Sequence, residues 1–343
     1  YYCIKFQDSI NVAVCDTPAG EYRFYGRVHY EDGRVMAENQ PYDPSLICTK
    51  DGIFLYFGFA PCMINIPRYK GQDLKGGSVL QLADDMLTVQ KGPEVILPSK
   101  NYGKGTSFEG NEYSVNTHQL CYAVSEKPME GFTYGGVIVS NGDVGYQGRK
   151  EEDKLMSVGN NHGGLVCVND QWYIFYHRHT YLNQYNRQAC AEKVYFRPDG
   201  SIPQVTITTS GMNPEPLSGN ATYPAVYCCN LTNGHMGPLS SLGRTNPEVD
   251  FPYLTSVEDE RYITNVKDGD LIGYKYINLA ETKKVSISYL SDGEGKLEIY
   301  TENGRQKEEI NLPKTDKWTW ADAKTAFTEE KELYFVYKGT GSI

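Results

Sequence analysis

The sequence predicts an all-β chain in which a β-propeller precedes a β-sandwich. Its 343 residues include 28 Tyr, 34 Gly and 17 Pro, a composition that favours short strands and turns over helices. No stretch of about 12 residues holds an apolar stripe with the 3.6-residue period of an amphipathic helix. Similar strand-turn-strand segments recur along the chain, and its length is sufficient for two domains.

The first recurring segment, which we call an inner half, is an apolar strand, a tight turn and an aromatic strand. Residues 45–58 show this pattern around an Asp-Gly pair, which is a strong hairpin signal. Residues 164–180 show it again around the pair Asn169-Asp170. Both segments are therefore predicted to form β-hairpins.

The second recurring segment, which we call an outer half, has an alternating strand, an acidic residue, a proline turn and a glycine, followed by aromatic residues. Residues 10–26 and 119–135 share this order, and residues 78–96 and 187–205 are looser copies. We expect each outer half to contribute two strands beside the preceding inner half.

Inner and outer halves follow one another in residues 43–96 and 160–205, which predicts two complete four-stranded units. No inner half precedes the outer halves at residues 10 and 119, so we expect the sequence to be interrupted there, in the second case between Tyr113 and Ser114. Repeats of about 45 residues are typical of propeller blades. The alternative is one large sandwich with coincidental hairpins.

The pattern changes after about residue 235. Residues 237–249 are rich in loop-forming residues, and short strands separated by turn signals follow at regular spacing. This arrangement is typical of a sandwich. We therefore predict a propeller domain at 1–235, with the first blade and part of the third incomplete, and a sandwich domain at 236–343.

Charge and cysteine usage exclude several classes of protein. The formal net charge is -10 and no basic run is present, so nucleic acid is not an expected partner. No apolar run reaches the roughly 18 residues of a membrane span. The nine cysteines are odd in number and scattered without zinc-site spacing, which predicts free buried thiols rather than a disulfide framework.

Asp43 and His162 stand at equivalent points of the two complete units, where each inner half begins. In a propeller this position lies at the mouth of the central channel, so Asp43 is expected to direct a carboxylate into the cleft. The alternative is that an Asp before Pro only starts a turn. As a site residue, His162 could contact a sugar, support a carboxylate or bind a central metal ion. The alternative is that it is a hydrogen-bonded structural residue.

Further polar residues follow His162. The strand that ends in YHRHT is expected to carry His177 and His179 on one face and Arg178 on the other. Arg187, in the next predicted strand, is suited to bidentate hydrogen bonding with a carboxylate or with vicinal hydroxyls. The abundant Tyr side chains also suit sugar binding, because a flat apolar ring covers the C–H face of a pyranose, although most of them only fill strand positions.

Several of these segments resemble glycoside hydrolase family 43. They are YDPSL with DGIFLYFG, VAVCDTPAGEY, NNHGGLVCVNDQWYIFYHRHT and RQACAEKVYFRPDGSIPQVTITTSG. The resemblance implies a five-bladed propeller that acts on arabinose- and xylose-containing polysaccharides. Residues from 236 on, with IGYKYINL, DKWTW and ELYFVYKGTGSI, resemble carbohydrate-binding module family 6, which implies a jelly-roll sandwich.

The first resemblance implies inversion at the anomeric centre by three carboxylates, namely a base Asp, an Asp that raises the pKa of the acid, and a general-acid Glu. Only the pKa-modulating Asp has a matching position, Asp43. The base is expected before the first residue and the acid between Tyr113 and Ser114. Glu109 and Glu112 lie in the approach to that point, and neither is assigned the acid role.

The resemblances also imply binding roles. His162 matches a channel histidine that helps to hold a central cation, often calcium, and Arg187 matches an arginine that contacts the sugar in the deepest subsite. Trp318 matches an aromatic sugar platform of the binding module. No cofactor is required, and a structural calcium ion is the one metal that the resemblance suggests.

These observations lead to one principal functional hypothesis. We expect a secreted or periplasmic inverting glycosidase that removes α-L-arabinofuranosyl or β-D-xylosyl units from arabinoxylan, arabinan or xylan. Its partner is then a polysaccharide or oligosaccharide. The alternative is a non-catalytic carbohydrate-binding propeller that has lost its acid and base strands. A third hypothesis, a scaffold for protein partners, is supported by no feature of the sequence.

Overall fold

The all-β prediction is confirmed by a computed structural model. The structure describes the backbone of residues 2–6, 9–39, 41–59, 75–99, 118–180, 185–236 and 250–343. These residues form β-strands and four 3-10 helices, η2 (Asn141–Asp143), η3 (Tyr146–Gly148), η4 (Glu151–Asp153) and η5 (Ala225–Tyr227). Within these ranges, no helix has the length and apolar character needed to span a membrane.

The chain divides into two compact units. The first comprises Tyr1–Ser114 and Ala123–Gly135, and the second comprises Val115–Tyr122 and Gly136–Ile343. Strands β8 (Gln119–Val124) and β9 (Thr133–Ser140) form a two-stranded sheet that contributes residues to both units. Each unit is described by itself.

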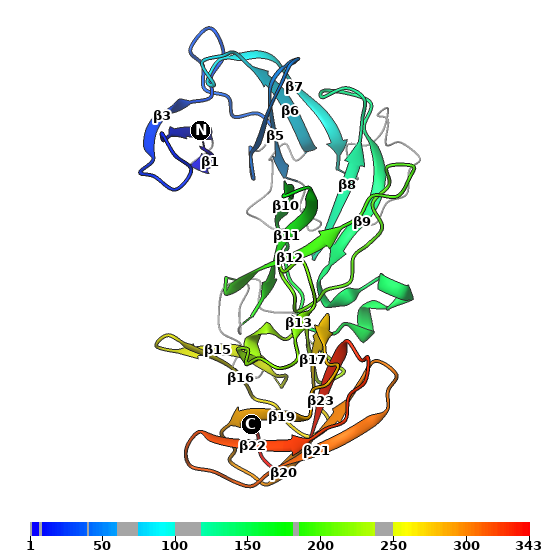
Figure 1. Ribbon diagram of the computed structural model, residues 1–343. Helices are drawn as coiled ribbons and strands as arrows, with labels where there is room; N and C mark the ends of the chain where they lie inside the picture. Colours follow the sequence, from blue (N-terminus) through cyan, green and yellow to red (C-terminus); the bar gives the residue numbers. More distant parts are fainter. Residues whose placement is uncertain are drawn as a thin grey trace. The chain divides into compact units, whose positions relative to one another are not determined.

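The first unit contains a four-stranded antiparallel sheet in the order β4-β5-β6-β7 (Figure 1). Its strands are β4 (Ser45–Thr49), β5 (Gly52–Phe59), β6 (Gly76–Leu82) and β7 (Val89–Pro98). Lys50 and Asp51 form the turn between β4 and β5, and Gly52 begins β5 with φ 135°, in a region that favours glycine. The predicted complete unit at 43–96 is confirmed.

Both faces of the central strands β5 and β6 are buried. Leu55 and Leu80, on β5 and β6, pack with Ile10 and Val12 of β2 in one apolar cluster. Their neighbours Phe54 and Val79 point to the other face and pack with Met129 and Phe132 in a second cluster. Because successive side chains of a strand alternate between faces, each face of the sheet meets a different part of the unit, as a propeller blade does.

The first strands of the chain form a smaller antiparallel sheet. Its members are β1 (Tyr2–Phe6), β2 (Ser9–Val14) and β3 (Arg23–Arg27). Strands β2 and β3 correspond to the outer half predicted at 10–26, and β1 pairs with β2 in front of it.

The second unit contains the other predicted hairpin. Strands β10 (Gly163–Val168), β11 (Gln171–His179) and β12 (Arg187–Val194) form a three-stranded antiparallel sheet. Asn169 and Asp170 connect β10 to β11 with φ 49° and 63°. Asn and Asp tolerate this left-handed region, which the favoured two-residue hairpin turns require, so the predicted turn is confirmed.

The predicted fourth strand of this sheet is wrong. Residues 201–208 form no strand, so the unit predicted at 160–205 is incomplete. Pro203 interrupts the segment and lacks an N–H for a ladder. The backbone N–H of Val205 instead donates to the carbonyl oxygen of Ile138 at 2.8 Å, so the segment is held by irregular contacts.

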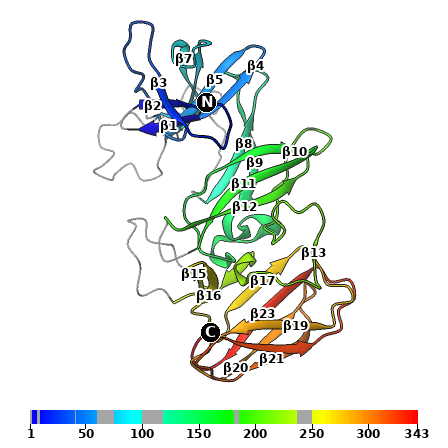
Figure 2. The ribbon, with the colours of Figure 1, turned by 60° about the vertical axis from the view of Figure 1, so that its left-hand side comes forward.

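The rest of the second unit is a β-sandwich. One layer is a five-stranded sheet in the order β14-β17-β23-β20-β21, and a second layer contains the pair β19-β22. Figure 2 shows β17, β23, β20 and β21 of the first layer together with β19 of the second. The strands of the first layer are β14 (Asn230–Thr232), β17 (Leu271–Lys275), β23 (Glu332–Gly339), β20 (Gly295–Tyr300) and β21 (Gln306–Leu312). The second layer has β19 (Lys284–Tyr289) and β22 (Thr319–Lys324), and the short pairs are β13 (Leu217–Ser218) with β18 (Ile277–Asn278) and β15 (Tyr253–Val257) with β16 (Glu260–Thr264).

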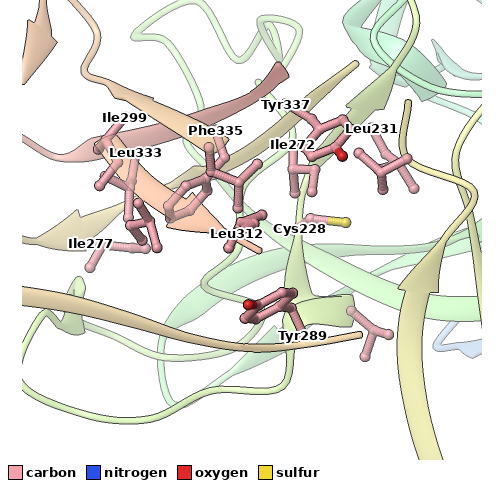
Figure 3. Close-up of a cluster of buried hydrophobic side chains, with 14 of the residues drawn as sticks. Cys228, Leu231, Ile272, Ile277, Tyr289, Ile299, Leu312, Leu333, Phe335 and Tyr337 are labelled. Carbon is pink, nitrogen blue, oxygen red and sulfur yellow. The ribbon is translucent and has the colours of Figure 1, made fainter. Parts of the chain in front are cut away.

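The core of the sandwich lies between these layers (Figure 3). Leu312 and Tyr337 of the five-stranded sheet are fully buried, and Tyr289 of β19 packs in the same cluster. Alternate residues of the second layer, including Val285 and Ala321, cover the cluster from their side. The period-two pattern predicted from the sequence therefore generates this core.

The predicted boundary between residues 235 and 236 does not coincide with a break in hydrogen bonding. Strand β14 lies before this boundary but pairs with β17, and β13 pairs with β18. The linker predicted at 237–249 lies outside the described residues.

The cysteine prediction is confirmed in one part and wrong in another. The seven cysteines whose side chains are described are free, but only Cys228 and Cys229 are buried. Cys48 and Cys167 are exposed because β4 and β10 are edge strands whose residues are exposed on both faces.

Candidate functional site

Three histidine side chains form a row at one end of the β10–β12 sheet. His177 and His179 lie two residues apart on β11 and share one face, as predicted. The ring of His162 stacks on that of His177, with centroids 5.5 Å apart and planes at 27°. The rings of His177 and His179 are also 5.5 Å apart, at 77°. We call these three side chains the histidine row.

Two asparagines fix the loop that carries His162. The side-chain amide of Asn161 donates to the carbonyl oxygen of His118 at 3.3 Å, and its Oδ1 accepts the backbone N–H of His177 at 3.2 Å. Nε2 of His179 donates to the carbonyl oxygen of Asn160 at 2.9 Å. The loop therefore binds to β11 through backbone and side-chain groups, and His162 is held beside His177.

Glycines allow this close approach. A Cβ atom at Gly163 would collide with the carbonyl oxygen of Phe175, and one at Gly159 would collide with the imidazole of His179. The Asn-Asn-His-Gly-Gly sequence thus combines the hydrogen-bonding groups of the loop with the small residue needed against β11. These residues are adjacent to His162 in the sequence, but no local pattern predicts that they position its side chain.

Arg187 completes the group. It lies opposite His179 in the β11–β12 register, and its guanidinium donates to Oδ1 of Asn160 at 3.3 Å. Burial, followed by the nearby Arg187, His179 and His162, lowers the pKa of His177 to about 4. Nδ1 of His177 accepts the backbone N–H of His162 at 3.2 Å, in agreement with an uncharged ring. The structure therefore brings together two of the predicted site residues, His162 and Arg187.

The described residues around His162 do not fit a calcium site. Calcium takes six to eight oxygen ligands, with carboxylates prominent among them. The neighbours of His162 are instead imidazoles, asparagines and an arginine, and the described residues contain no group of three His, Cys, Asp or Glu side chains arranged to hold a metal ion. The calcium ion suggested by the resemblance stays a prediction.

Asp43 belongs to the first unit. It is exposed, precedes β4, and has φ 49°, a conformation that Asp tolerates better than most residues. It lines a pocket of about 270 Å³ together with Ser45, Tyr56 and Phe57. Asp43 therefore lies in a bend and on a pocket wall, and its role as a site residue stays a prediction.

Arg187 lines a second pocket, of about 360 Å³, within the second unit. One side of this pocket comes from the end of β11 and the start of β12. The other comes from the β15–β16 hairpin of the sandwich, which contributes Ser256 and Arg261. We call it the arginine pocket. The sequence analysis missed Arg261, because no local pattern relates it to a residue 74 positions earlier.

Trp318 lies on the sandwich, directly before β22, and 48% of its surface is exposed. Its ring meets the ring of Tyr262 edge to face, with centroids 5.4 Å apart and planes at 73°. The exposed indole and the phenol edge form an aromatic surface of the kind that binds a sugar ring. Tyr262, on β16, was also missed, because only the fold brings it to Trp318.

The remaining predictions about the site concern residues that the structure does not describe. The expected interruption between Tyr113 and Ser114 lies outside the described residues, as do Glu109 and Glu112. The general acid and the general base stay without an assigned residue.

Comparisons with known proteins agree with the sequence resemblance. The family described as glycosyl hydrolases family 43 matches residues 1–202. A xylosidase/arabinosidase of Thermoclostridium stercorarium is 38% identical over 373 aligned positions, which cover 100% of this chain and 77% of that protein. An arabinoxylan arabinofuranohydrolase of Paenibacillus polymyxa is 24% identical, and the alignment covers 97% of this chain and 54% of that protein, so the chain spans about half of this relative.

Two solved structures are also similar. A family 43 arabinoxylan arabinofuranohydrolase of Bacillus subtilis has 19% identity and a TM-score of 0.43, with 98% of this chain and 72% of that chain covered. A family 6 carbohydrate-binding module of Clostridium stercorarium has 13% identity and a TM-score of 0.30, with 38% of this chain and 92% of that chain covered.

Proposed function

Because the chain belongs to glycosyl hydrolases family 43, we propose that this glycosidase removes α-L-arabinofuranosyl or β-D-xylosyl units from arabinoxylan or a related plant polysaccharide, with inversion. The observation that carries the proposal is the 38% identity, over the whole chain, with a protein named xylosidase/arabinosidase. The second relative is named for its action on arabinoxylan, which supports the same substrate class.

Asp43 is the proposed pKa-modulating carboxylate of this reaction. Inverting hydrolysis needs a protonated acid beside the leaving oxygen and an ionised base that activates water on the opposite face. A further negative charge near the acid keeps its proton in place at neutral pH. The exposed position of Asp43 on a pocket wall supports this role.

The acid is proposed to lie in an internal segment that this sequence does not contain. The alignment with the Thermoclostridium protein has 373 positions against 343 residues here, so about 30 positions of that protein face no residue of this chain. This difference supports an interrupted sequence. If the protein itself lacks these positions, the alternative is a carbohydrate-binding propeller without catalytic activity.

The sandwich is proposed to be a binding module similar to carbohydrate-binding module family 6. Support comes from its two-layer architecture and from the exposed Trp318 beside Tyr262. Replacement of Trp318 by Ala should release the full-length protein from insoluble xylan. The same change at Trp172, which is partly exposed on β11 and lies outside the sandwich, is the control and should not.

We also propose that the protein acts outside the cytoplasm, because its polymeric substrate is found outside the cell. Fractionation of the producing cells, with activity measured in each fraction, tests this location. Activity confined to the cytoplasm would contradict it.

Hydrolysis of aryl arabinofuranoside and aryl xyloside tests the enzymatic proposal. We expect the full-length protein to cleave at least one of them, and Asp43→Asn to lower kcat/KM by about 100-fold or more, since a positioned carboxylate contributes on this scale to general acid catalysis. Asp51→Asn, in the turn of the same blade, is the control and should keep the parent rate. Full activity of Asp43→Asn would exclude the assigned role, and hydrolysis of neither substrate would favour the binding protein.

A further inference from the structure

The arginine pocket combines residues from the β10–β12 sheet and from the sandwich. Thr180, Arg187 and Gln188 line it on one side, and Thr255, Ser256 and Arg261 line it on the other. All of them belong to the second unit. The sandwich thus contributes directly to a pocket that contains the proposed sugar-binding arginine.

Direct hydrogen bonds hold the two walls together. The backbone N–H of Leu254, on β15, donates to the carbonyl oxygen of Thr180 at 2.7 Å. The buried guanidinium of Arg178 donates to the carbonyl oxygens of Val226, at 2.7 Å, and of Cys228. Val226 itself lines the pocket. Strand β15 is therefore tied to the end of β11 by a backbone hydrogen bond, and the segment that carries Val226 is tied to β11 by Arg178.

Strand alternation separates the two faces of β16. Arg261 lies opposite Ser256 in the hairpin register and lines the pocket, whereas the next residue, Tyr262, contacts Trp318. Successive side chains of a strand point to opposite faces, so Arg261 faces the pocket and Tyr262 faces the aromatic surface. Arg261 is consequently separate from the aromatic platform of the proposed binding module.

The charge of the pocket is opposite to that of the protein. The chain carries a formal net charge of -10, yet the described lining of this pocket includes Arg187 and Arg261 and no acidic residue. The acidic turn at 258–260 does not line it. Among the described residues, the side chain of Arg261 has no ion-pair partner, so its positive charge is available to a ligand.

We propose that the arginine pocket binds the carboxylate of an acidic sugar, and that Arg261 determines this specificity. The inference rests on the proposed function, because it specifies the polysaccharide as one that carries uronic acid side groups. A neutral pentose needs hydroxyl partners only, which the threonine, serine and amide side chains supply. The Arg261 guanidinium adds planar, permanently charged donors that match a carboxylate.

The test compares two probes with the full-length protein. One is a xylo-oligosaccharide with a single glucuronic acid side group, and the other is the same molecule after reduction of the carboxyl to an alcohol. We expect the acidic probe to bind about tenfold more tightly in low salt, the scale of one charge-assisted hydrogen-bonded contact in a partly exposed site. The preference should shrink in 0.5 M salt because the site is open to solvent.

Variants of Arg261 test whether this residue causes the preference for the acidic probe. Arg261→Gln should reduce it to less than twofold while leaving the affinity for the reduced probe within about twofold, and Arg261→Lys should restore part of it. Arg305→Gln removes an exposed arginine in another part of the sandwich and should keep the full preference. Equal binding of the two probes by the parent protein, or a preference unchanged in Arg261→Gln, would overturn the proposal.

This outcome is independent of the enzymatic proposal. Hydrolysis of the neutral aryl glycosides without any preference for the acidic probe would contradict only the proposed carboxylate site. A clear preference for the acidic probe without hydrolysis of the aryl glycosides would contradict only the proposed glycosidase reaction.

Discussion

The two sheets that begin with an inner hairpin, β4–β7 and β10–β12, share a sequence pattern but differ in how they are completed. The first gains a fourth strand, and its central strands are buried on both faces by apolar side chains such as Leu80 and Val79. The second has three strands, which bury apolar residues such as Ile174 together with the charged groups Arg178 and Glu192. The same local motif therefore leads to apolar burial in one unit and to mixed apolar and charged burial in the other.

The irregular segment after β12 explains the difference. A strand satisfies its backbone groups in a ladder, whereas an irregular buried segment needs side-chain partners. The backbone N–H of Ile207 donates to Oδ1 of Asp143 at 2.8 Å, and that of Thr208 donates to Oε1 of Glu192 at 2.8 Å. Two acidic side chains thus supply the hydrogen-bond acceptors that a neighbouring strand would otherwise provide.

The Asp143 carboxylate needs its own compensation, since a buried unpaired charge is costly. Lys275, on β17 of the sandwich, donates to Oδ2 of Asp143 at 2.8 Å, and both side chains are buried. Glu192 also accepts the hydroxyl groups of Tyr176 and Thr208. The polar contacts that end the sheet therefore also attach it to the sandwich.

The largest expected effect comes from breaking the ion pair. Lys275→Met should lower the free energy of unfolding by about 3–5 kcal/mol, because Asp143 is left charged and buried. Urea denaturation followed by tryptophan fluorescence measures this change. Lys127→Met removes the exposed partner of Glu130 in the first unit and should have little effect. Equal effects of the two substitutions would mean that the buried pair does not stabilise the second unit.

A smaller effect concerns pH. Burial, together with the nearby Asp143, raises the pKa of Glu192 to about 8 despite the hydrogen bonds from Thr208 and Tyr176. In the unfolded chain the pKa of a Glu is about 4.3, so between these values the folded state binds the additional proton. Stability must then fall as pH rises through this window, by about 2 kcal/mol from pH 6 to 8.

The matched variant isolates this contribution. Glu192→Gln cannot titrate and keeps an oxygen acceptor for the N–H of Thr208, so the difference in stability between pH 6 and 8 should decrease by about the same 2 kcal/mol. Denaturation at both pH values gives the comparison. An unchanged pH dependence in the variant would show that Glu192 does not hold a proton in the folded protein.

The smallest effect distinguishes the two hairpin turns. Asp170 has φ 63°, so Asp170→Gly should stabilise the second unit by about 0.5–1 kcal/mol through relief of the left-handed conformation. In the first unit Gly52 already occupies the positive φ position, and Asp51 does not have a positive φ. Asp51→Gly should therefore give no stabilisation, and a gain in both variants would contradict this explanation.

The sequence by itself determined the features that depend on local pattern. Period-two alternation and turn chemistry predicted the all-β class, both inner hairpins and the shared face of His177 and His179, because each involves residues close in the chain. The family resemblance added the activity, which the family match supports.

Only the tertiary structure decided which distant residues meet. Lys275 and Asp143 are 132 positions apart, and neither lies in a motif that indicates the other. The same holds for Arg187 with Arg261 in one pocket and for Trp318 with Tyr262 in one aromatic surface. Local pattern specifies how a strand alternates, but the partners of its polar groups depend on the packing of whole sheets, because buried charges are satisfied wherever the fold provides a partner.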